Sequence, residues 1–229
     1  LSVGAANWMA TAIVVGEKYR DALLIDIGTT TTDVIPIVNG IPIPEGRTDI
    51  ERLGSGELIY TGAVRTPVEA VSPYAPFRKG TVGVAADRFA LMGDVHVYRG
   101  VLSPDDYTAP TPDGRPTSRS FAAERLARSV CADVEMMTDH DIARLANAFA
   151  FSQLASISLA IQRVVKRNPT LALAVVTGLG SFIAEEAAVT VGLRSTALSK
   201  DFGSDAARSA PAAAVALLLA RTLTRRTAS

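Results

Sequence analysis

An apolar strand that runs directly into an acidic, threonine-rich turn constrains this chain most. Residues 22–27 read Ala-Leu-Leu-Ile-Asp-Ile and end at a glycine, which is typical of a buried strand. Residues 32–38 alternate in polarity, and Asn39-Gly40 is a strong tight-turn signal before a short returning edge strand at 41–44. The sequence therefore predicts that the turn between residues 26 and 33 lies at the tip of a hairpin.

The residue types in this turn suit a polyphosphate with a metal ion. Gly28 lets the backbone approach an anion without a Cβ clash, and turn amides and threonine hydroxyls can donate to phosphate oxygens. A bare phosphate pocket would avoid carboxylates, so we expect Asp26 or Asp33 to hold Mg²⁺ through its waters. We predict Asp26 as the metal ligand and both aspartates as catalytic. The predicted phosphate-binding residues here are Gly28, Thr29, Thr30, Thr31 and Thr32.

The alternative is a solvated hairpin whose threonines simply favour strands. An aspartate that emerges from an apolar strand directly into glycine and threonine is more specific than a lone glycine motif, which favours the functional interpretation.

A second glycine turn follows another apolar strand. Residues 171–176 predict a buried strand, and residues 177–181 read Thr-Gly-Leu-Gly-Ser before a helix expected at 182–191. Two glycines let a ligand lie close to the main chain, and the amides of the helix can point at a phosphate. We therefore predict phosphate contacts from Gly178, Gly180 and Ser181, with an ordinary strand-to-helix turn as the alternative.

The remaining segments predict an α/β domain. Residues 45–120 are rich in Gly, Pro and Thr, with short strand-like runs at 57–60, 81–85 and 95–98 and a surface excursion or lid at 103–119. Helices are expected at 121–132 and from a cap at Thr138 to a stop at residues 168–169. A C-terminal, Ala-rich helix is expected from residue 203 onward. Alternating strands and helices favour a sheet flanked by helices, in one domain over 1–229 with a helical part at 120–229.

Composition limits the partners. The 23 Lys and Arg residues equal the 23 Asp and Glu residues, which removes the positive field that nucleic acid or an anionic membrane would need. The longest apolar run, 212–220, is shorter than the ~20 residues of a membrane-spanning helix. A single cysteine, Cys131, excludes an internal disulfide and fits a reducing cytoplasm. We expect small-molecule partners, no nucleic acid and no membrane, and leave a homo-oligomer open.

Residues 24–34 resemble the second phosphate loop of the actin, sugar-kinase and heat-shock ATPase superfamily, in which two ribonuclease-H-like domains close over a nucleotide. More narrowly, they resemble the hydantoinase A and oxoprolinase family, except that Thr29 stands where that family usually has a second glycine. The resemblance implies a ribonuclease-H-like domain with a mixed sheet. The chain lacks an initiator Met and opens inside a helix-like stretch at 5–15, so we expect the N-terminal partner domain to be incomplete or missing.

Segments 5–8, 56–67, 92–100 and 209–216 resemble the subfamily linked to tetrahydromethanopterin-dependent one-carbon metabolism, over essentially the whole chain. This implies a transferase of methanofuran biosynthesis that joins an aminomethylfuran diphosphate to γ-glutamyltyramine and releases diphosphate. A carboxylate, with Asp33 a candidate, would accept the phenol proton. The alternatives are an ATP-dependent amidohydrolase of the hydantoinase or 5-oxoprolinase kind and a non-catalytic, actin-like nucleotide-binding module.

The acceptor pocket is the least specific prediction. The predicted substrate-binding residues are Gly56, Tyr60, Thr61, Arg65 and Asp94. The planar fork of Arg65 makes it the best anion ligand of this group, for example for a γ-glutamyl carboxylate. A structural turn and strand is the alternative. His96 is expected to be a satisfied structural residue and Cys131 to be a packing residue.

Overall fold

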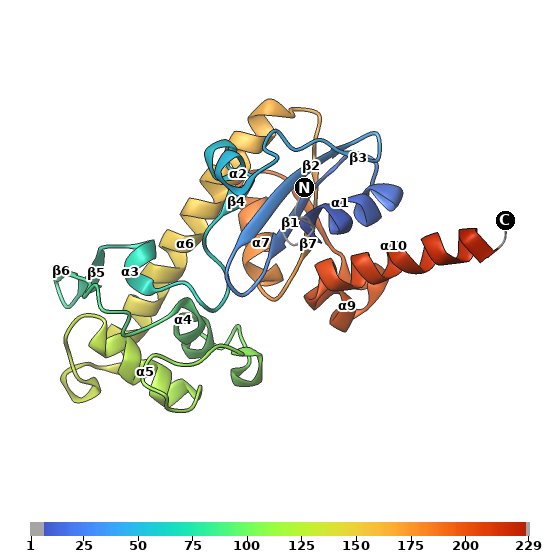
Figure 1. Cartoon of the computed structure of the whole chain (residues 1–229). Coiled ribbons are helices and arrows are strands. Elements are labelled where there is room, and N and C mark those ends of the chain that lie inside the picture. Colours follow the sequence, from blue (N-terminus) through green and yellow to red (C-terminus); the bar gives the residue numbers. More distant parts are fainter. Residues whose placement is uncertain (1–6, 228–229) are drawn as a thin grey trace. The chain divides into compact units, whose positions relative to one another are not determined.

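The computed structural model describes residues 7–227, and these fall into two compact units (Figure 1). The sheet unit contains the described residues up to Gly28, residues Thr32–Ile59 and the residues from Ser158 onward. The helical unit contains Thr29–Thr31 and Tyr60–Ile157. The chain thus passes between the units on either side of residues 29–31, between residues 59 and 60, and between residues 157 and 158.

A mixed sheet forms the centre of the sheet unit, as the sequence predicted. Its strands follow the order β3-β2-β1-β7-β8, and β4 also pairs with β2. Strand β1 pairs antiparallel with β2 and parallel with β7, while β7 and β8 are parallel. The strands are β1 Ala22–Ile27, β2 Thr32–Val38, β3 Ile41–Pro42, β4 Leu58–Ile59, β7 Leu173–Thr177 and β8 Arg194–Ala197.

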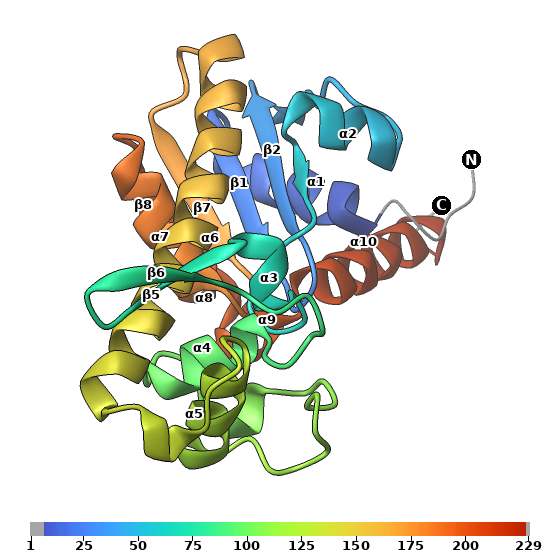
Figure 2. The same cartoon turned by 90° about the vertical axis from the view of Figure 1, so that its left-hand side faces the viewer.

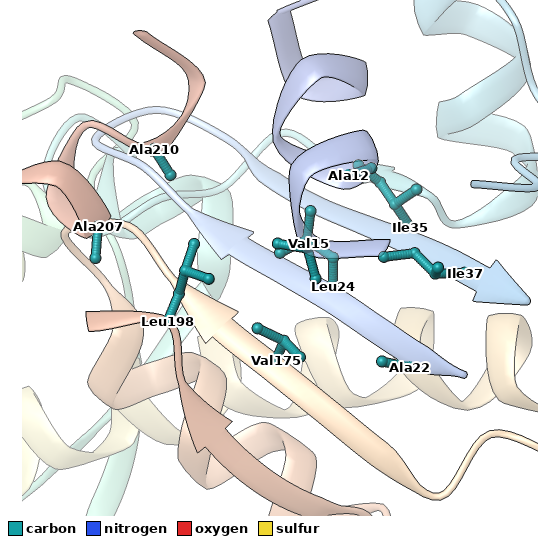
Figure 3. Close-up of a cluster of buried hydrophobic side chains, with 10 residues drawn as sticks. All are labelled: Ala12, Val15, Ala22, Leu24, Ile35, Ile37, Val175, Leu198, Ala207 and Ala210. Carbon is teal, nitrogen blue, oxygen red and sulfur yellow. The ribbon is translucent and has the colours of Figure 1, made fainter. Parts of the chain in front are cut away.

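Helices cover this sheet and bury its apolar side chains. One cluster joins Ala12 and Val15 of α1 to Leu24 of β1 and Ile35 of β2 (Figure 3). In Figure 2, α1 lies behind the sheet and the last turns of α6 lie in front of it. The helices of the sheet unit are α1 Asn7–Lys18, α2 Asp49–Ser55, α7 Ser181–Thr190, α8 Ser199–Phe202, α9 Ser204–Arg208 and α10 Ala210–Thr227.

The predicted tight turn after β2 is confirmed. Asn39 and Gly40 both have positive φ, at 53° and 80°, which matches the two-residue turn that suits the twist of a hairpin. A Cβ added to Gly16 of α1 would lie 2.4 Å from the carbonyl oxygen of Gly40, so the helix and the turn approach each other at two glycines. This contact fixes the end of α1 against the β2–β3 hairpin.

The helical unit contains short elements and the first part of one long helix. Its elements are α3 Val68–Val71, β5 Tyr74–Phe77, β6 Gly80–Gly83, α4 Met92–Tyr98, η2 Pro104–Asp106, α5 Arg119–Arg128 and η3 Val134–Met136. The prediction of a strand at 95–98 was wrong, because this segment belongs to α4. Every residue of α4 is buried, and a short run that is buried on all sides has no periodicity to separate a helix from a strand.

Helix α6, Asp139–Arg167, begins as predicted and continues from the helical unit into the sheet unit. The hydroxyl of Thr138 accepts from the amide of Asp141, and the carboxylate of Asp141 accepts from the amide of Thr138. By length and composition this helix can cross a membrane, with 39% of its apolar window buried. A buried core helix passes the same test, and Ile142, Phe149 and Ile161 of α6 are fully buried or nearly so.

Three further expectations differ from the structure. Helix α2 lies within a segment for which we predicted no helix. The C-terminal helix expected from residue 203 is divided into α9 and α10 at Ser209. Cys131, expected to pack, is exposed and has a φ of 57°.

The contact between Gly16 and Gly40 gives a test of the fold. Gly16→Ala is expected to lower the free energy of unfolding by roughly 1–3 kcal/mol, because the new methyl overlaps a backbone carbonyl. Gly54→Ala is the matched control, since a Cβ at this helical position of α2 meets no atom within 4 Å. Urea unfolding should show Gly54→Ala unchanged or stabilised by up to ~1 kcal/mol. Equal stability of the two variants would contradict this packing.

Candidate functional site

The hydrogen-bonded strands bring the two predicted turns to one end of the sheet. Asp26 of β1 lies opposite Asp33 of β2 on one side and beside Thr177 of β7 on the other. Cross-strand neighbours of this kind point to the same face of a sheet. The amide of Gly180 also donates to the carbonyl of Ile27 at 2.8 Å, so the glycine turn is fastened to the end of β1.

Asp26 is a buried carboxylate without a counter-charge. Its side chain is 6% exposed, and no hydrogen-bond donor among residues 7–227 contacts it. Burial, together with the neighbouring charge of Asp33, raises the pKa of Asp26 to about 7. Near neutral pH this carboxyl group can therefore exchange a proton or accept a cation.

Asp33 has a different environment because an arginine holds it. Nη2 of Arg52 donates to Oδ1 of Asp33 at 2.7 Å and to the carbonyl of Glu57 at 3.1 Å. The guanidinium also lies 3.9 Å from the ring centre of Trp8 and is 1% exposed. Burial raises the pKa of Asp33, and the charge of Arg52 opposes this. Of the two aspartates, only Asp33 thus has an ion-pair partner among the described residues.

Arg52 and Glu57 are site residues that sequence reasoning missed. The carboxylate of Glu57 is buried and accepts from the amides of Glu45 and Gly46 at 2.8 and 2.9 Å, which ties down the chain before α2. The capping pair Thr48 and Glu51 was a readable sequence signal for α2.

Gly56, a predicted substrate residue, ends α2 in the left-handed conformation with a φ of 82°. A Cβ there would lie 3.4 Å from the carbonyl oxygen of Ala160, so the structure gives this glycine a capping role. Its predicted substrate contact stays a prediction.

The glycine turn after β7 approaches Asp26 closely, but its amides are occupied. A Cβ on Gly178, which has a φ of 86°, would lie 2.4 Å from Oδ1 of Asp26. The amides of Gly178, Gly180 and Ser181 donate to the carbonyls of Ala207, Ile27 and Gly178, respectively. These three amides are therefore not free donors in this structure, and the predicted phosphate contacts of Gly178, Gly180 and Ser181 stay a prediction. Because Gly178 has no side chain, the turn leaves space beside the carboxylate of Asp26.

The turn at residues 28–31, called the threonine turn below, differs from the glycine turn because its backbone amides are unpaired. In the described part of the chain, no acceptor takes the backbone amides of residues 28–31. Oγ1 of Thr29 and Oγ1 of Thr30 lie 3.4 Å apart, and Thr31 is half-buried. Thr32 is buried in β2, so its hydroxyl is less suited to a ligand than those of its neighbours. Unpaired turn amides and adjacent hydroxyls are the donors that a phosphate requires.

The residues at the end of β1 fit a magnesium ion that also binds a substrate phosphate. No group of three or more His, Cys, Asp and Glu side chains that could hold a metal occurs among the described residues. Mg²⁺ commonly uses one or two carboxylates and fills its remaining positions with water and phosphate oxygens. A free, buried carboxylate such as Asp26 suits that arrangement, and Mg²⁺ stays a proposal.

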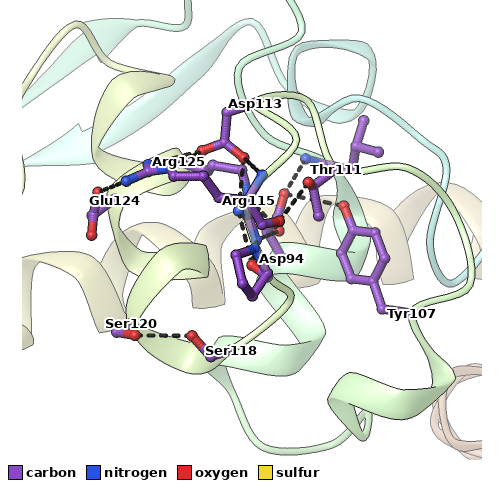
Figure 4. Close-up of polar contacts among 11 residues, drawn as sticks. Asp94, Tyr107, Thr111, Asp113, Arg115, Ser118, Ser120, Glu124 and Arg125 are labelled. Atoms are coloured by element: carbon purple, nitrogen blue, oxygen red, sulfur yellow. Dashed lines mark hydrogen bonds and ion pairs between the residues drawn. The ribbon is translucent and has the colours of Figure 1, made fainter.

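The predicted acceptor residues other than Gly56 are dispersed within the helical unit. Tyr60 is 71% exposed, and Arg65 is exposed as well. Thr61 is buried, and its Oγ1 accepts from Nε2 of Gln153 at 2.8 Å. Asp94 is fully buried on α4, where Oδ1 accepts from Nε of Arg125 at 2.8 Å (Figure 4). Arg65 and Tyr60 are thus open to a ligand, whereas Thr61 and Asp94 serve buried networks.

His96 was predicted to be structural, and its contacts agree. It is 1% exposed and its Nε2 lies 3.0 Å from Oε1 of Gln153. Burial lowers the pKa of His96 to about 4, so the ring is neutral at physiological pH. The hydrogen bonds of Gln153 to Thr61 and to the carbonyl of Gly62 connect α6 to the segment that carries Arg65.

A family model described as Hydantoinase/oxoprolinase matches residues 1–222. This chain belongs to the hydantoinase/oxoprolinase family. The match spans both units and includes the threonine turn and the glycine turn. It confirms the family that the sequence motifs indicated.

Two curated relatives of this hydantoinase/oxoprolinase chain carry the same name, (4-{4-[2-(gamma-L-glutamylamino)ethyl]phenoxymethyl}furan-2-yl)methanamine synthase. The protein from Methanocaldococcus jannaschii is 35% identical over 224 residues, which cover 97% of this chain and 67% of that protein. The protein from Methanococcus vannielii is 29% identical over 204 residues, which cover 87% of this chain and 91% of that protein.

A solved structure supports the fold alone. The nucleotide-free structure of acetone carboxylase matches 82% of this chain with a TM-score of 0.52 and 14% sequence identity. The match covers 28% of the acetone carboxylase chain. It agrees with the α/β architecture of a mixed sheet with flanking helices.

The environment of Asp26 predicts a pH-dependent stability. Its pKa lies at about 7 in the folded protein against an ordinary 3.8, so between these values the folded chain binds more protons than the unfolded chain. Stability must therefore fall as pH rises through this interval. Asp26→Asn is expected to be more stable than the wild type at pH 8 by roughly 1–4 kcal/mol and equally stable below pH 4.

Urea unfolding at both pH values, in the presence of a chelator, measures the difference. Asp105→Asn, at an exposed position of η2, is the control and should behave like the wild type at both pH values. An Asp26→Asn variant that is no more stable than the wild type at pH 8 would contradict the conclusion that the buried carboxylate of Asp26 is unpaired.

Proposed function

We propose that this chain is a transferase of methanofuran-type cofactor biosynthesis, which joins an aminomethylfuran diphosphate to γ-glutamyltyramine and releases diphosphate. The observation that carries the proposal is the shared name of two relatives that match 97% and 87% of the chain. That name describes a product in which a phenoxymethyl link joins a furan to a γ-glutamylaminoethyl phenyl group. The name supports an enzyme that acts on small molecules.

The bond that must form is the ether between the phenol oxygen and the furan methylene carbon. In the proposed reaction the bond from that carbon to a diphosphate oxygen breaks, the ether bond forms, and the phenol proton passes to a carboxylate that acts as the base. The leaving diphosphate carries most of the developing charge, so groups that neutralise it lower the barrier most.

The threonine turn supplies donors for the leaving diphosphate. The unpaired amides of residues 28–31 and the hydroxyls of Thr29 and Thr30 suit its oxygens. When bound, Mg²⁺ would supply further positive charge at the same oxygens. Asp26 would hold the ion, while Arg52 keeps Asp33 in place beside it. Asp33 stays the candidate proton acceptor, with one of its carboxylate oxygens already accepting a hydrogen bond from Arg52.

The family includes proteins described as hydantoinases and oxoprolinases, so an ATP-dependent amidohydrolase is the second candidate. It would use the same turn for ATP. We also assign the sheet unit to the ribonuclease-H-like, actin-like class, which its mixed sheet with helices on both faces supports. A non-catalytic module of that class is the third candidate.

In the deciding experiment, the protein is incubated with the aminomethylfuran diphosphate, γ-glutamyltyramine and Mg²⁺ in the absence of ATP. Release of diphosphate together with the ether product, detected by mass spectrometry, supports the transferase. ATP hydrolysis coupled to opening of a cyclic amide, without ether formation, would overturn it in favour of the hydrolase. Nucleotide-dependent assembly without turnover of either substrate would favour the third candidate.

Substitution at Asp26 tests the site within this reaction. Asp26→Asn is expected to lower the magnesium-dependent rate by about 100-fold or more, because the amide is a poorer ligand for the cation. Cys131→Ser is the control, since Cys131 is exposed and takes no part in the site, and its rate should match the wild type. Circular dichroism confirms that both variants are folded. A wild-type rate from Asp26→Asn would refute the metal role.

A further inference from the structure

The helical unit contains a polar cleft that the threonine turn does not account for. Its volume is about 520 Å³, and Arg65, Asp87, Arg88 and the segment 109–112 line it. This size falls within the range of sites that hold small molecules. Two arginines and one aspartate therefore line a common cavity.

The charges in this cleft are not used within the described part of the protein. Neither guanidinium forms an ion pair with a carboxylate of residues 7–227, and Asp87 has no partner there. Arg88 also has a positive φ of 52°, which is uncommon for a residue with a side chain. The carboxylate of Glu69 accepts from the amide of Arg88 at 2.8 Å and holds it in this conformation.

Backbone hydrogen bonds connect the segment that carries Arg65 to the threonine turn. The amides of Val64 and Arg65 donate to the carbonyl of Thr29 at 3.1 and 2.8 Å, and all three residues belong to the helical unit. The amides of Met92 and Gly93 donate to the carbonyls of Thr66 and Val64, which fixes the same segment to α4. The backbone of Arg65 is thus hydrogen-bonded to Thr29, one of the residues proposed to bind the diphosphate.

A buried network anchors the part of the chain that contributes residues 109–112 to the cleft. Arg125 donates to Asp94 at 2.8 Å, to Asp113 at 3.1 Å and to the carbonyl of Pro116 at 3.3 Å (Figure 4). Oγ1 of Thr111 donates to the carbonyl of Arg115 at 2.7 Å. The segment 109–112, which we predicted to be part of an excursion or lid, is therefore anchored before any ligand arrives.

We propose that this cleft binds the α-amino-acid end of the acceptor, with Arg65 and Arg88 receiving the carboxylate and Asp87 receiving the ammonium group. The proposal rests on the proposed function, because a γ-glutamyl group keeps its α-carboxylate and its α-ammonium free. Guanidinium forks bind carboxylates with two parallel hydrogen bonds. Two cations and one anion complement a zwitterion, whereas a diphosphate would be repelled by Asp87.

Titration calorimetry with γ-glutamyltyramine alone, without a furan diphosphate, tests the cleft. Arg88→Gln is expected to weaken binding by about 10- to 100-fold. The matched control is Arg128→Gln, at an exposed position of α5 outside the cleft, and it should bind within about 2-fold of the wild type. Absence of binding by the wild type, or equal affinity of Arg88→Gln and the wild type, would overturn the proposal.

Two analogues identify the group that each side chain binds. The α-carboxamide analogue should bind the wild type more weakly than γ-glutamyltyramine does, and Arg88→Gln should weaken it little further. The α-N-acetyl analogue should also bind the wild type more weakly than γ-glutamyltyramine does, and Asp87→Asn should weaken the binding of this analogue little further. If Arg88→Gln weakens inorganic diphosphate and leaves γ-glutamyltyramine unaffected, the cleft serves the phosphate end and the proposal is wrong.

These binding results distinguish a failure of the cleft proposal from a failure of the proposed transferase function. Selective binding of γ-glutamyltyramine by a protein that forms no ether product would refute the transferase and retain the cleft. Ether formation at a rate that does not depend on Arg88 and Asp87 would retain the transferase and refute the cleft.

Discussion

The pairing of β1 with β2 on one side and with β7 on the other is the constraint on which the rest of the sheet unit depends. It places Asp26 between Asp33 and Thr177 at the end of a strand whose six residues are all buried. A carboxylate in this position loses most of its hydration, and no described donor replaces the water. The raised pKa of Asp26 follows directly from this arrangement.

The two neighbouring aspartates have identical side chains but different partners. Arg52 reaches Asp33 from α2 and stacks on Trp8, so one acidic group is neutralised within the fold. Asp26 receives no such partner and keeps its capacity for a cation or a proton. Pairs of titratable groups with unlike surroundings are typical of sites where chemistry occurs.

The helical unit uses buried charge to shape a segment that has little regular structure. Asp94 and Arg125 are both almost completely buried, and Arg125 extends the pair to Asp113 and Pro116. Removing one partner of such a pair leaves an uncompensated charge, so the network resists rearrangement. A stretch rich in proline and glycine thereby becomes the fixed wall of a cleft.

The sequence by itself determined strands β1, β2 and β7, the threonine turn that follows β1, the capped start of α6 and the family. These features depend on local periodicity, turn residues and short motifs, which lie next to one another in the chain. The tertiary structure decided that Arg52 holds Asp33 and that the amides of Gly178, Gly180 and Ser181 are occupied. It also decided that residues 95–98 are part of a helix rather than a strand. It also gathered Arg65, Asp87 and Arg88 around one cleft. Burial and partner choice depend on residues far apart in the sequence, and no local pattern encodes them.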